Sequence, residues 1–340
     1  MKNFFLISIL LITVFVVSAC GAAASPAATP TAVPTAVLVK PFRVAVIMPS
    51  AVNDIAFSQS MYDALNRMQT EMGGAEKMKF VYSQGMFVID DATAALQTYA
   101  SQGYDLVIAH GSQYGPCIQE VAPKFPKVSF IWSNASTPSN LPNVFDLTAA
   151  AQEGGYVNGV LAAALTKSKV IGIVGPVEVG ESKRYIEGFK AGVAATDPEI
   201  QVSVNYIGSF SDVVKASEVA TGYISANADI MTGTGQMVIG PIGKANESNV
   251  LWFGTQSDQT SPAPKTVVAN QVYHWEVILR KVIAAVQSGK LGGESFDINL
   301  ANSGEVIEYN PGYHLSVEVK ASGDKAIQGI INGTIKVTLP

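Results

Sequence analysis

Short apolar runs rich in β-branched residues alternate with longer amphipathic stretches over much of the chain. In the first half, the apolar runs are 43–48, 78–82, 105–109 and 128–132. The stretches between them predict helices near 57–72, 92–102 and 117–122. Runs that are apolar on both faces are typical of parallel strands covered by helices. The pattern therefore predicts a doubly wound α/β sheet.

The same alternation repeats in the second half of the chain. The further strands that it predicts are 169–174, 201–206, 228–231 and 250–253. The further helices are 153–166, 182–195 and 212–227. Three later segments, 266–269, 273–288 and 321–339, are too few for a third domain, so we expect them to complete both sheets.

Two such sheets, joined by several chain crossings, predict two lobes with a multi-strand hinge. We expect lobe I to comprise residues 42–147 plus about 256–305, and lobe II residues 148–255 plus about 306–340. In open α/β sheets, ligands bind beyond the carboxyl ends of the strands. Two sheets that face each other therefore predict a ligand cleft between the lobes.

The N-terminal segment has the features of an export signal. Its apolar run, 4–17, is about 14 residues long, which is short of the roughly 20 needed to span a bilayer. Residues 17–20, Val-Ser-Ala-Cys, resemble the bacterial lipobox, whose cysteine is lipidated and becomes the mature N-terminus. We therefore expect residues 1–19 to be a lipoprotein signal peptide and Cys20 to anchor the protein on the extracytoplasmic face of the cell membrane. The alternative is an ordinary signal peptide in which Cys20 is incidental.

Residues 20–41 are predicted to be a linker after the lipidated cysteine. They are mostly Ala, Pro, Thr and Val, and their prolines are spaced so that neither a helix nor a strand can propagate. At roughly 3 Å per residue, an extended proline-rich chain of this length reaches about 60 Å. A body on such a tether can meet a partner in the membrane.

Composition narrows the classes of function. The 340 residues are 48% hydrophobic and 14% charged, with a formal net charge of −5 and no prominent Lys/Arg cluster. No nucleic acid partner is expected, because phosphate recognition needs concentrated basic charge. Two cysteines and three histidines are too few for a disulfide framework or a four-ligand zinc site, and no Asp-rich calcium loop is present. We expect no metal and no cofactor.

The sequence contains no recognisable catalytic set. The His-Gly-Ser segment at 110–112 is not a Gly-x-Ser-x-Gly nucleophile elbow. Cys117 lies at a predicted helix start, but an inert buried thiol is the commoner outcome for a lone cysteine. Residues 175–182 have the glycine spacing of a phosphate-binding loop, yet Glu181 stands where that loop needs a lysine. We therefore expect neither an enzyme nor a nucleotide-binding loop.

Small and polar residues follow the predicted strands. The candidates for ligand contacts at these strand ends are Asp54, Gln113, Asn134, Gln236, Gln256 and Asp258. Amides donate and accept hydrogen bonds and carboxylates accept them, which suits a neutral, polar solute. Turn chemistry explains any one of these loops by itself. It is their convergence on one edge of each sheet that favours a binding site.

Asp54 and Phe57 follow the first strand, and each fits two roles. Asp54 either accepts hydrogen bonds from a ligand or caps the next helix by accepting them from backbone N–H groups. Phe57 begins that helix, where its ring either packs into the core or faces a ligand. Core packing is the commoner fate of an isolated aromatic residue.

Four segments carry motifs that occur together in a known family. Residues 54–60 are similar to Asp-x-x-Phe-Asn-Gln-Ser, residues 188–192 match Gly-Phe-x-x-Gly, and residues 254–259 are similar to Gly-x-Asp-x-Asp-Gln. Residues 153–159 are similar to the helix that opens the second lobe of that family. Taken in their order along the chain, the four motifs resemble the basic membrane protein family of ABC transporter substrate-binding lipoproteins. This family is related to purine nucleoside receptor lipoproteins. The resemblance implies a periplasmic-binding-protein type I fold that closes on a small ligand and docks on ABC permease subunits.

The resemblance also implies roles for single residues. Phe57 would stack on a purine base, with Asp54 and Ser58 beside it. Gln256 stands where the family has an aspartate associated with ribose hydroxyls, which leaves Asp258 as the only acid of that motif.

The segment 273–275, Tyr-His-Trp, stands where nucleoside receptors have a lysine. The loss of both the acid and the lysine removes the usual ribose clamp, so a free base or another flat heterocycle becomes a more plausible ligand. Trp275 would then offer a second stacking face, although core packing is its commoner fate.

The resulting hypothesis is a lipid-anchored receptor of an ABC importer that binds a purine-like ligand, with Phe57, Asn134, Gln256, Asp258 and Trp275 among its contacts. One alternative is a sugar receptor of the same fold, because stacking aromatics and amides also suit pyranoses. Another is a sensor that reports a ligand to a membrane signalling protein. A nucleoside hydrolase is disfavoured by the missing catalytic set.

Overall fold

The computed structural model describes residues 40–135 and 137–339, which form one compact unit. The predicted signal peptide, Cys20 and all of the predicted linker except Lys40 and Pro41 lie outside these residues. Within the described residues, no helix is both long enough and apolar enough to cross a membrane.

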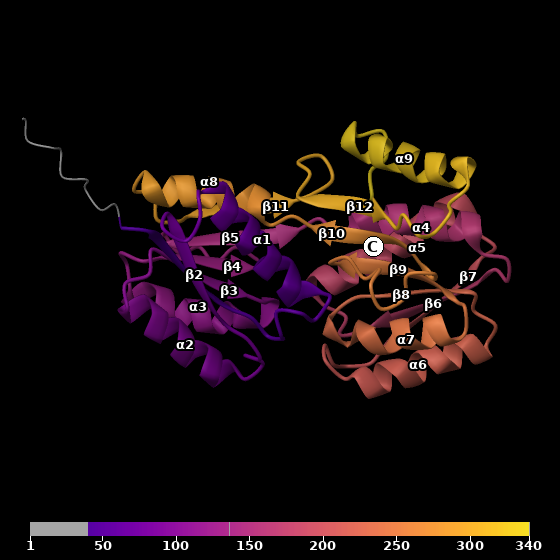
Figure 1. The fold of residues 1–340 in the computed structure, drawn as a ribbon, viewed down its shortest axis with the longest axis horizontal. Coiled ribbons are helices and arrows are strands. Elements are labelled where there is room, and N and C mark those ends of the chain that lie inside the picture. The colour runs from indigo at the N-terminus through magenta and orange to yellow at the C-terminus, as the bar shows by residue number, and fades with distance from the viewer. Residues whose placement is uncertain (1–39, 136, 340) are drawn as a thin grey trace, which may run out of the picture. The chain divides into compact units, whose positions relative to one another are not determined.

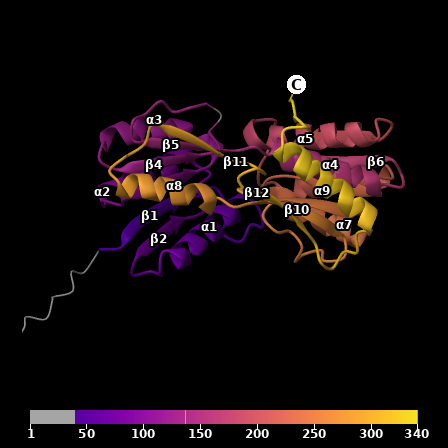
Figure 2. The ribbon, with the colours of Figure 1, turned by 90° about the horizontal axis from the view of Figure 1, so that it is seen from above.

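Six parallel strands form the first sheet, in the order β11-β5-β4-β3-β1-β2. They are β1 (Phe42–Ile47), β2 (Met78–Ser83), β3 (Leu106–His110), β4 (Ser129–Ser133), β5 (Val144–Ala149) and β11 (Glu294–Ile298). The helices of this lobe are α1 (Phe57–Glu71), α2 (Ile89–Ser101), α3 (Gly115–Val121) and α8 (Glu276–Gln287). Figures 1 and 2 show the late elements α8 and β11 beside the early part of the chain.

The second sheet also has six strands, in the order β12-β10-β9-β8-β6-β7. They are β6 (Val170–Gly175), β7 (Gln201–Tyr206), β8 (Ile230–Gly233), β9 (Leu251–Gln256), β10 (Val267–Tyr273) and β12 (Glu305–Tyr309). The helices of this lobe are α4 (Gln152–Leu165), α5 (Gly180–Thr196), α6 (Val213–Ser225), α7 (Ile239–Glu247) and α9 (Val317–Ile331). Only the edge strand β12 is antiparallel to its neighbour among these described strands. The predicted fold class, two doubly wound parallel-sheet lobes, is confirmed.

The described chain crosses from one sheet to the other after β5, after β10 and after β11. Three crossings make a hinge of several segments, as the sequence predicts. One boundary differs from the prediction, which assigned about 256–305 to lobe I. Strand β10 pairs with β9 and β12 in the second sheet, so the chain returns to lobe I only after Tyr273. All seven residues of β10 are buried, because the strand lies in the interior of the sheet.

The core of each lobe lies where the sheet meets its covering helices. Every residue of β3, β4, β8 and β10 is buried, as expected for strands covered on both faces. Helices α4 and α5 approach so closely that a Cβ at Gly159 would overlap the backbone of Phe189, and a Cβ at Gly192 that of Tyr156. The glycines of two family-like motifs are therefore explained by helix packing.

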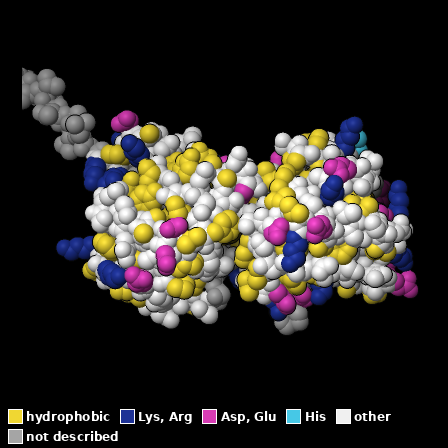
Figure 3. Space-filling model, turned by 90° about the horizontal axis from the view of Figure 1, so that it is seen from below, with side chains coloured by type: hydrophobic (Ala, Val, Ile, Leu, Met, Phe, Trp, Pro, Cys, Tyr) yellow, Lys and Arg dark blue, Asp and Glu magenta, His cyan; other side chains and the backbone are white. Residues whose placement is uncertain are grey.

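Charged side chains are dispersed over the face of the molecule in Figure 3. Lysines and arginines are scattered there, with acidic side chains among them. Several described ion pairs are exposed contacts between neighbouring residues, such as Lys124 with Glu120 and Lys320 with Asp324. This face therefore offers no concentrated basic area for phosphate backbones.

Candidate ligand-binding site

Residues from both lobes line one cavity of about 380 Å³, part of which is open to solvent. The lobe I residues are Pro49, Phe57, Phe87, Gly111, Ser112, Gln113 and Asn134. The lobe II residues are Glu181, Ser182, Phe210, Thr234, Gly235, Gln236 and Gln256. All of them end a strand or follow its carboxyl end, the edge at which open α/β sheets bind ligands. The structure thus brings together five of the predicted residues: Phe57, Gln113, Asn134, Gln236 and Gln256.

The aromatic wall of the cavity is built around Phe57. Its ring stacks on the imidazole of His110, with centroids 3.9 Å apart and planes 7° apart. Complete burial lowers the pKa of His110 to about 3, so the imidazole is neutral and its Nε2–H donates to the Phe57 carbonyl oxygen at 2.9 Å. Trp275 packs against Phe57 in a T-shaped arrangement, with ring centroids 6.2 Å apart. These contacts hold the Phe57 ring in one orientation at the cavity.

The polar wall contains buried atoms that lack hydrogen-bond partners. Among the described residues, nothing bonds Asn134 Oδ1, Thr234 Oγ1 or Gln236 Oε1, although all three atoms are buried. Buried polar groups in proteins are nearly always hydrogen-bonded. These three residues, from both lobes, are therefore well placed to bond a ligand.

The backbone at two of the cavity residues is also unusual. Asn134 has φ = 62° and Gln256 has φ = 70°, which is the left-handed region. This conformation costs a residue other than glycine roughly 1–3 kcal/mol and is found preferentially at ligand-binding positions. The strain adds to the case that both side chains are placed for binding.

Glu181 contributes a buried carboxyl group to the cavity. Tyr273 donates its hydroxyl to Glu181 Oε1 at 2.6 Å, and Gln256 donates Nε2 to Oε2 at 3.0 Å. Gln256 Oε1 in turn accepts from the Gly235 N–H at 3.3 Å. Burial raises the pKa of Glu181, while the hydrogen bonds from Tyr273 and Gln256 and the charge of Arg184 act in the opposite direction.

Four predicted residues do not line the cavity, and two of them belong to the first strand–helix loop. The carboxylate of Asp54 accepts hydrogen bonds from the backbone N–H groups of Ala56, Ser58 and Gln59. This is the capping role, one of the two that the sequence left open. The Ser58 hydroxyl accepts from the Ser50 N–H at 3.1 Å. Both side chains therefore shape the loop that carries Phe57.

The other two, Asp258 and Trp275, are also engaged by the protein. Asp258 Oδ1 accepts from the Thr260 N–H and from Asn270 Nδ2, at 2.8 and 2.9 Å. Trp275 is fully buried, and its indole N–H donates to the Ser60 hydroxyl at 2.9 Å. Trp275 packs behind Phe57 as a core residue and offers no face to the cavity.

Three lining residues with distinctive chemistry were not among the predicted contacts: Phe87, Glu181 and Phe210. Phe87 follows β2 and Phe210 follows β7, two strand ends that carry no run of amides and so give no polar signal in the sequence. Glu181 stands where a phosphate-binding loop needs a lysine, which by itself does not indicate a ligand contact. Its position, second in a helix that follows a buried strand, was the available signal.

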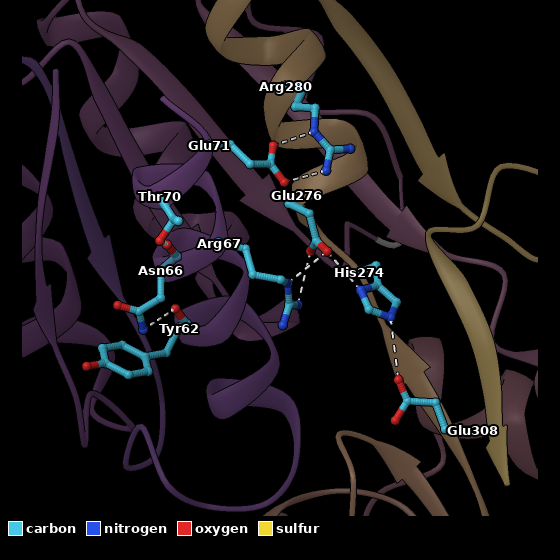
Figure 4. A network of polar contacts seen from close by, with 9 residues as sticks. All are labelled: Tyr62, Asn66, Arg67, Thr70, Glu71, His274, Glu276, Arg280 and Glu308. Carbon is cyan, nitrogen blue, oxygen red and sulfur yellow. Dashed lines mark hydrogen bonds and ion pairs between the residues drawn. The ribbon is translucent and has the colours of Figure 1, made fainter. Parts of the chain in front are cut away.

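A second polar group lies beside the hinge, and we call Arg67, His274, Glu276 and Glu308 the hinge cluster (Figure 4). Arg67 holds Glu276 through two hydrogen bonds, of 2.8 and 3.0 Å. His274 Nδ1 lies 2.8 Å from Glu276 Oε1, and His274 Nε2 lies 3.8 Å from Glu308 Oε1. The cluster therefore connects α1 and α8 of lobe I with β12 of lobe II.

The charges of the hinge cluster are mutually stabilising. The hydrogen bond to Glu276 and the nearby carboxylate of Glu308 raise the pKa of His274 to about 9. Burial alone would raise the pKa of Glu276, but the hydrogen bonds from His274 and Arg67 hold it at about 2. Near neutral pH, His274 is therefore a cation between two carboxylates and is not available as a general base.

Comparisons with known proteins agree with this geometry. Residues 42–338 match the family described as ABC transporter substrate-binding protein PnrA-like. The ABC transporter nucleoside-binding protein BmpA of Lactococcus lactis is 26% identical over 310 residues, or 86% of each chain. The purine-binding protein of Brucella abortus is 28% identical over 200 residues, which cover 59% of this chain and 56% of that protein. An ABC transporter solute-binding protein of Conexibacter woesei has the same fold, with a TM-score of 0.73 and 23% identity over 88% of this chain and 98% of its own.

Proposed function

This chain belongs to the PnrA-like family of ABC transporter substrate-binding proteins, and we propose that it binds a purine base or nucleoside in the cavity between its lobes. The family consists of solute-binding proteins rather than enzymes, which confirms the prediction that the chain is not an enzyme. The proposed role of the cavity is therefore to bind a ligand, not to catalyse a reaction.

The observation that carries this proposal is the pairing of a fixed aromatic face with unpartnered amide atoms. Phe57 is held by His110 and offers a rigid surface on which a flat ring can stack. Asn134 and Gln236 place free acceptor atoms in the same cavity, from opposite lobes. A heterocycle with polar edges satisfies both walls at once, and Phe210 on lobe II supplies a second apolar surface.

The same arrangement supports a role in import. A ligand bonded by Asn134 of lobe I and Gln236 of lobe II favours the closed arrangement of the lobes, because only that arrangement makes both sets of contacts. We propose that the closed form docks on ABC permease subunits at the extracytoplasmic face, tethered through lipidated Cys20. Two or more acyl chains provide stable anchoring, whereas one is marginal.

A thermal-unfolding screen of the purified protein tests the proposed ligand class. We expect purine bases or nucleosides to raise the Tm, because a ligand at 100 times its Kd adds about 2.7 kcal/mol of stability. The Asn134→Ala variant, with a Kd about tenfold higher, should lose about half of this shift, whereas Glu71→Gln, outside the cavity, should keep it. Stabilisation by sugars or amino acids, with none by any heterocycle, would contradict the proposal and favour the sugar-receptor alternative.

A further inference from the structure

Glu181 is the one ionisable side chain among the described residues that line the cavity. It is 3% exposed and lies in the second position of α5, where the helix N-terminus favours a negative charge. Its two oxygens accept from Tyr273 and Gln256, one donor each. A carboxylate has about four acceptor positions. Glu181 therefore keeps acceptor capacity for a ligand in the cavity.

The neighbouring polar atoms are also acceptors. Gln236 Oε1 on lobe II and Asn134 Oδ1 on lobe I are buried, unpartnered and part of the same wall. No lysine, arginine or histidine lines the cavity within the described residues. A ligand that enters this site therefore meets unpartnered acceptor atoms and no cation from the described residues, so donors on the ligand find partners there.

We propose that Glu181 determines the specificity of the cavity: it accepts hydrogen bonds from a pair of adjacent donors on an uncharged ligand and excludes phosphorylated ligands. The inference rests on the proposed function and deepens it. Two parts of a nucleoside carry such a donor pair, the imino and amino edge of a guanine-type base and the vicinal hydroxyls of ribose. A phosphate group would instead face a buried carboxyl, with no cation among the described residues that line the cavity.

Isothermal titration with matched ligands separates these sources. The ligands are guanosine, inosine, which lacks the exocyclic amine, 2′,3′-dideoxyguanosine, which lacks the hydroxyl pair, and guanosine 5′-monophosphate. The proteins are wild type, Glu181→Gln, and Glu178→Gln as a control in the loop just before α5. Glu178 is exposed and pairs with Lys183 at 3.1 Å, away from the cavity lining.

We expect E181Q to bind guanosine about 10- to 100-fold more weakly than wild type, because it loses charge-assisted hydrogen bonds. The analogue that lacks the contacted donors should bind wild type and E181Q equally, which identifies the base edge or the sugar as the partner. E178Q should match wild type. The monophosphate should bind wild type about 100-fold more weakly than guanosine, since a dianion is desolvated without a partner.

Two results would overturn the inference while leaving the proposed function standing. One is guanosine binding by E181Q within twofold of wild type. The other is equal affinity of wild type for guanosine and its monophosphate, a comparison that needs no variant and so holds even if E181Q folds poorly. Failure of wild type to bind any purine base or nucleoside would instead overturn the proposed function, and this inference with it.

Discussion

The ligand cavity and the hinge cluster are both polar and both join the two lobes, but their hydrogen bonding is opposite. In the cavity, Asn134, Thr234 and Gln236 have buried atoms without partners in the described protein. In the hinge cluster, Glu276 is bonded by both Arg67 and His274. The paired groups stabilise the fold, whereas the unpaired groups keep hydrogen-bonding capacity that the proposed ligand would use.

We therefore expect the stability of the fold to depend on the hinge cluster and ligand binding to depend on the cavity residues. An unpartnered buried amide costs about 1–3 kcal/mol relative to a satisfied one, and the positive φ at Asn134 and Gln256 adds to that cost. Bonding to a ligand recovers part of it. We accordingly expect hinge variants to lose stability and cavity variants to lose affinity, with little overlap.

The largest effect is expected from Glu276→Ala, which leaves Arg67 and His274 without the carboxylate that both contact. Removal of one partner from a buried ion pair typically costs about 3–5 kcal/mol, and we expect the lower end of this range because the Arg67 side chain is 39% exposed. The Glu276 side chain is only 6% exposed, so water does not replace it readily. Urea unfolding at pH 7 measures the loss, and a change below about 1 kcal/mol would mean that the cluster contributes little to folding.

The second largest effect is expected in the pH dependence of the stability that the hinge cluster provides. Because the pKa of His274 is raised to about 9, its stabilisation is complete below its ordinary value of 6.5 and is lost as the pH rises through 9. The lowered pKa of Glu276 acts at the other end, where stability is lost as the pH falls through about 2.

The variant His274→Gln should therefore be less stable than wild type by about 1–3 kcal/mol at pH 6. The gap should close between pH 6.5 and pH 9. Urea unfolding at three pH values across this range gives the profile. A gap that stays constant with pH would show that His274 acts through packing rather than charge.

Cavity variants should behave in the opposite way. Asn134→Ala and Gln236→Ala each remove a buried group whose lack of a partner costs about 1–3 kcal/mol, so neither should lower the free energy of unfolding in the absence of ligand. Each should weaken purine binding about tenfold, the effect of one lost hydrogen bond with a desolvated partner. If either variant lost stability by several kcal/mol and kept its affinity, the contrast between the two regions would not hold.

The smallest effect is expected at the exposed pair Glu71–Arg280. This pair also joins α1 to α8, through hydrogen bonds of 2.7 and 2.8 Å, but its side chains are 40% and 48% exposed. Glu71→Gln should cost about 0–1 kcal/mol, because water screens exposed ion pairs, and should leave ligand affinity unchanged. A cost as large as that of Glu276→Ala would mean that burial does not separate the two pairs.

Most of the fold could be predicted from the sequence, because buried parallel strands and amphipathic helices leave clear periodic patterns. Strand β5 was missed because Asp146 interrupts its apolar run. In the structure that carboxylate is buried and accepts from the N–H and hydroxyl of Ser139. The hydrogen bonds that make this buried carboxylate tolerable leave no signal in the local hydrophobic pattern. The boundary at β10 was missed for a related reason, because the sheet that a strand joins depends on the strands with which it pairs.

Positions at strand ends of the candidate site could be predicted from the sequence, whereas the roles of single side chains could not. The carboxyl edges of both sheets converge, which places Gln113, Asn134, Gln236 and Gln256 on one cavity. The sequence could not show whether Asp54 caps a helix or contacts a ligand, because the residue looks the same in either role. It also could not show whether Trp275 packs in the core or faces the cavity. Those assignments depend on which backbone groups lie nearby in three dimensions.

A crystal structure of the protein with guanosine tests the central claim most directly. The account predicts a ring stacked on Phe57, with ligand donors within about 3.2 Å of Asn134 Oδ1 and Gln236 Oε1. The hinge cluster should keep its contacts within the protein. A nucleoside bound away from this cavity, with the Asn134 and Gln236 amides bonded only to protein, would contradict the account.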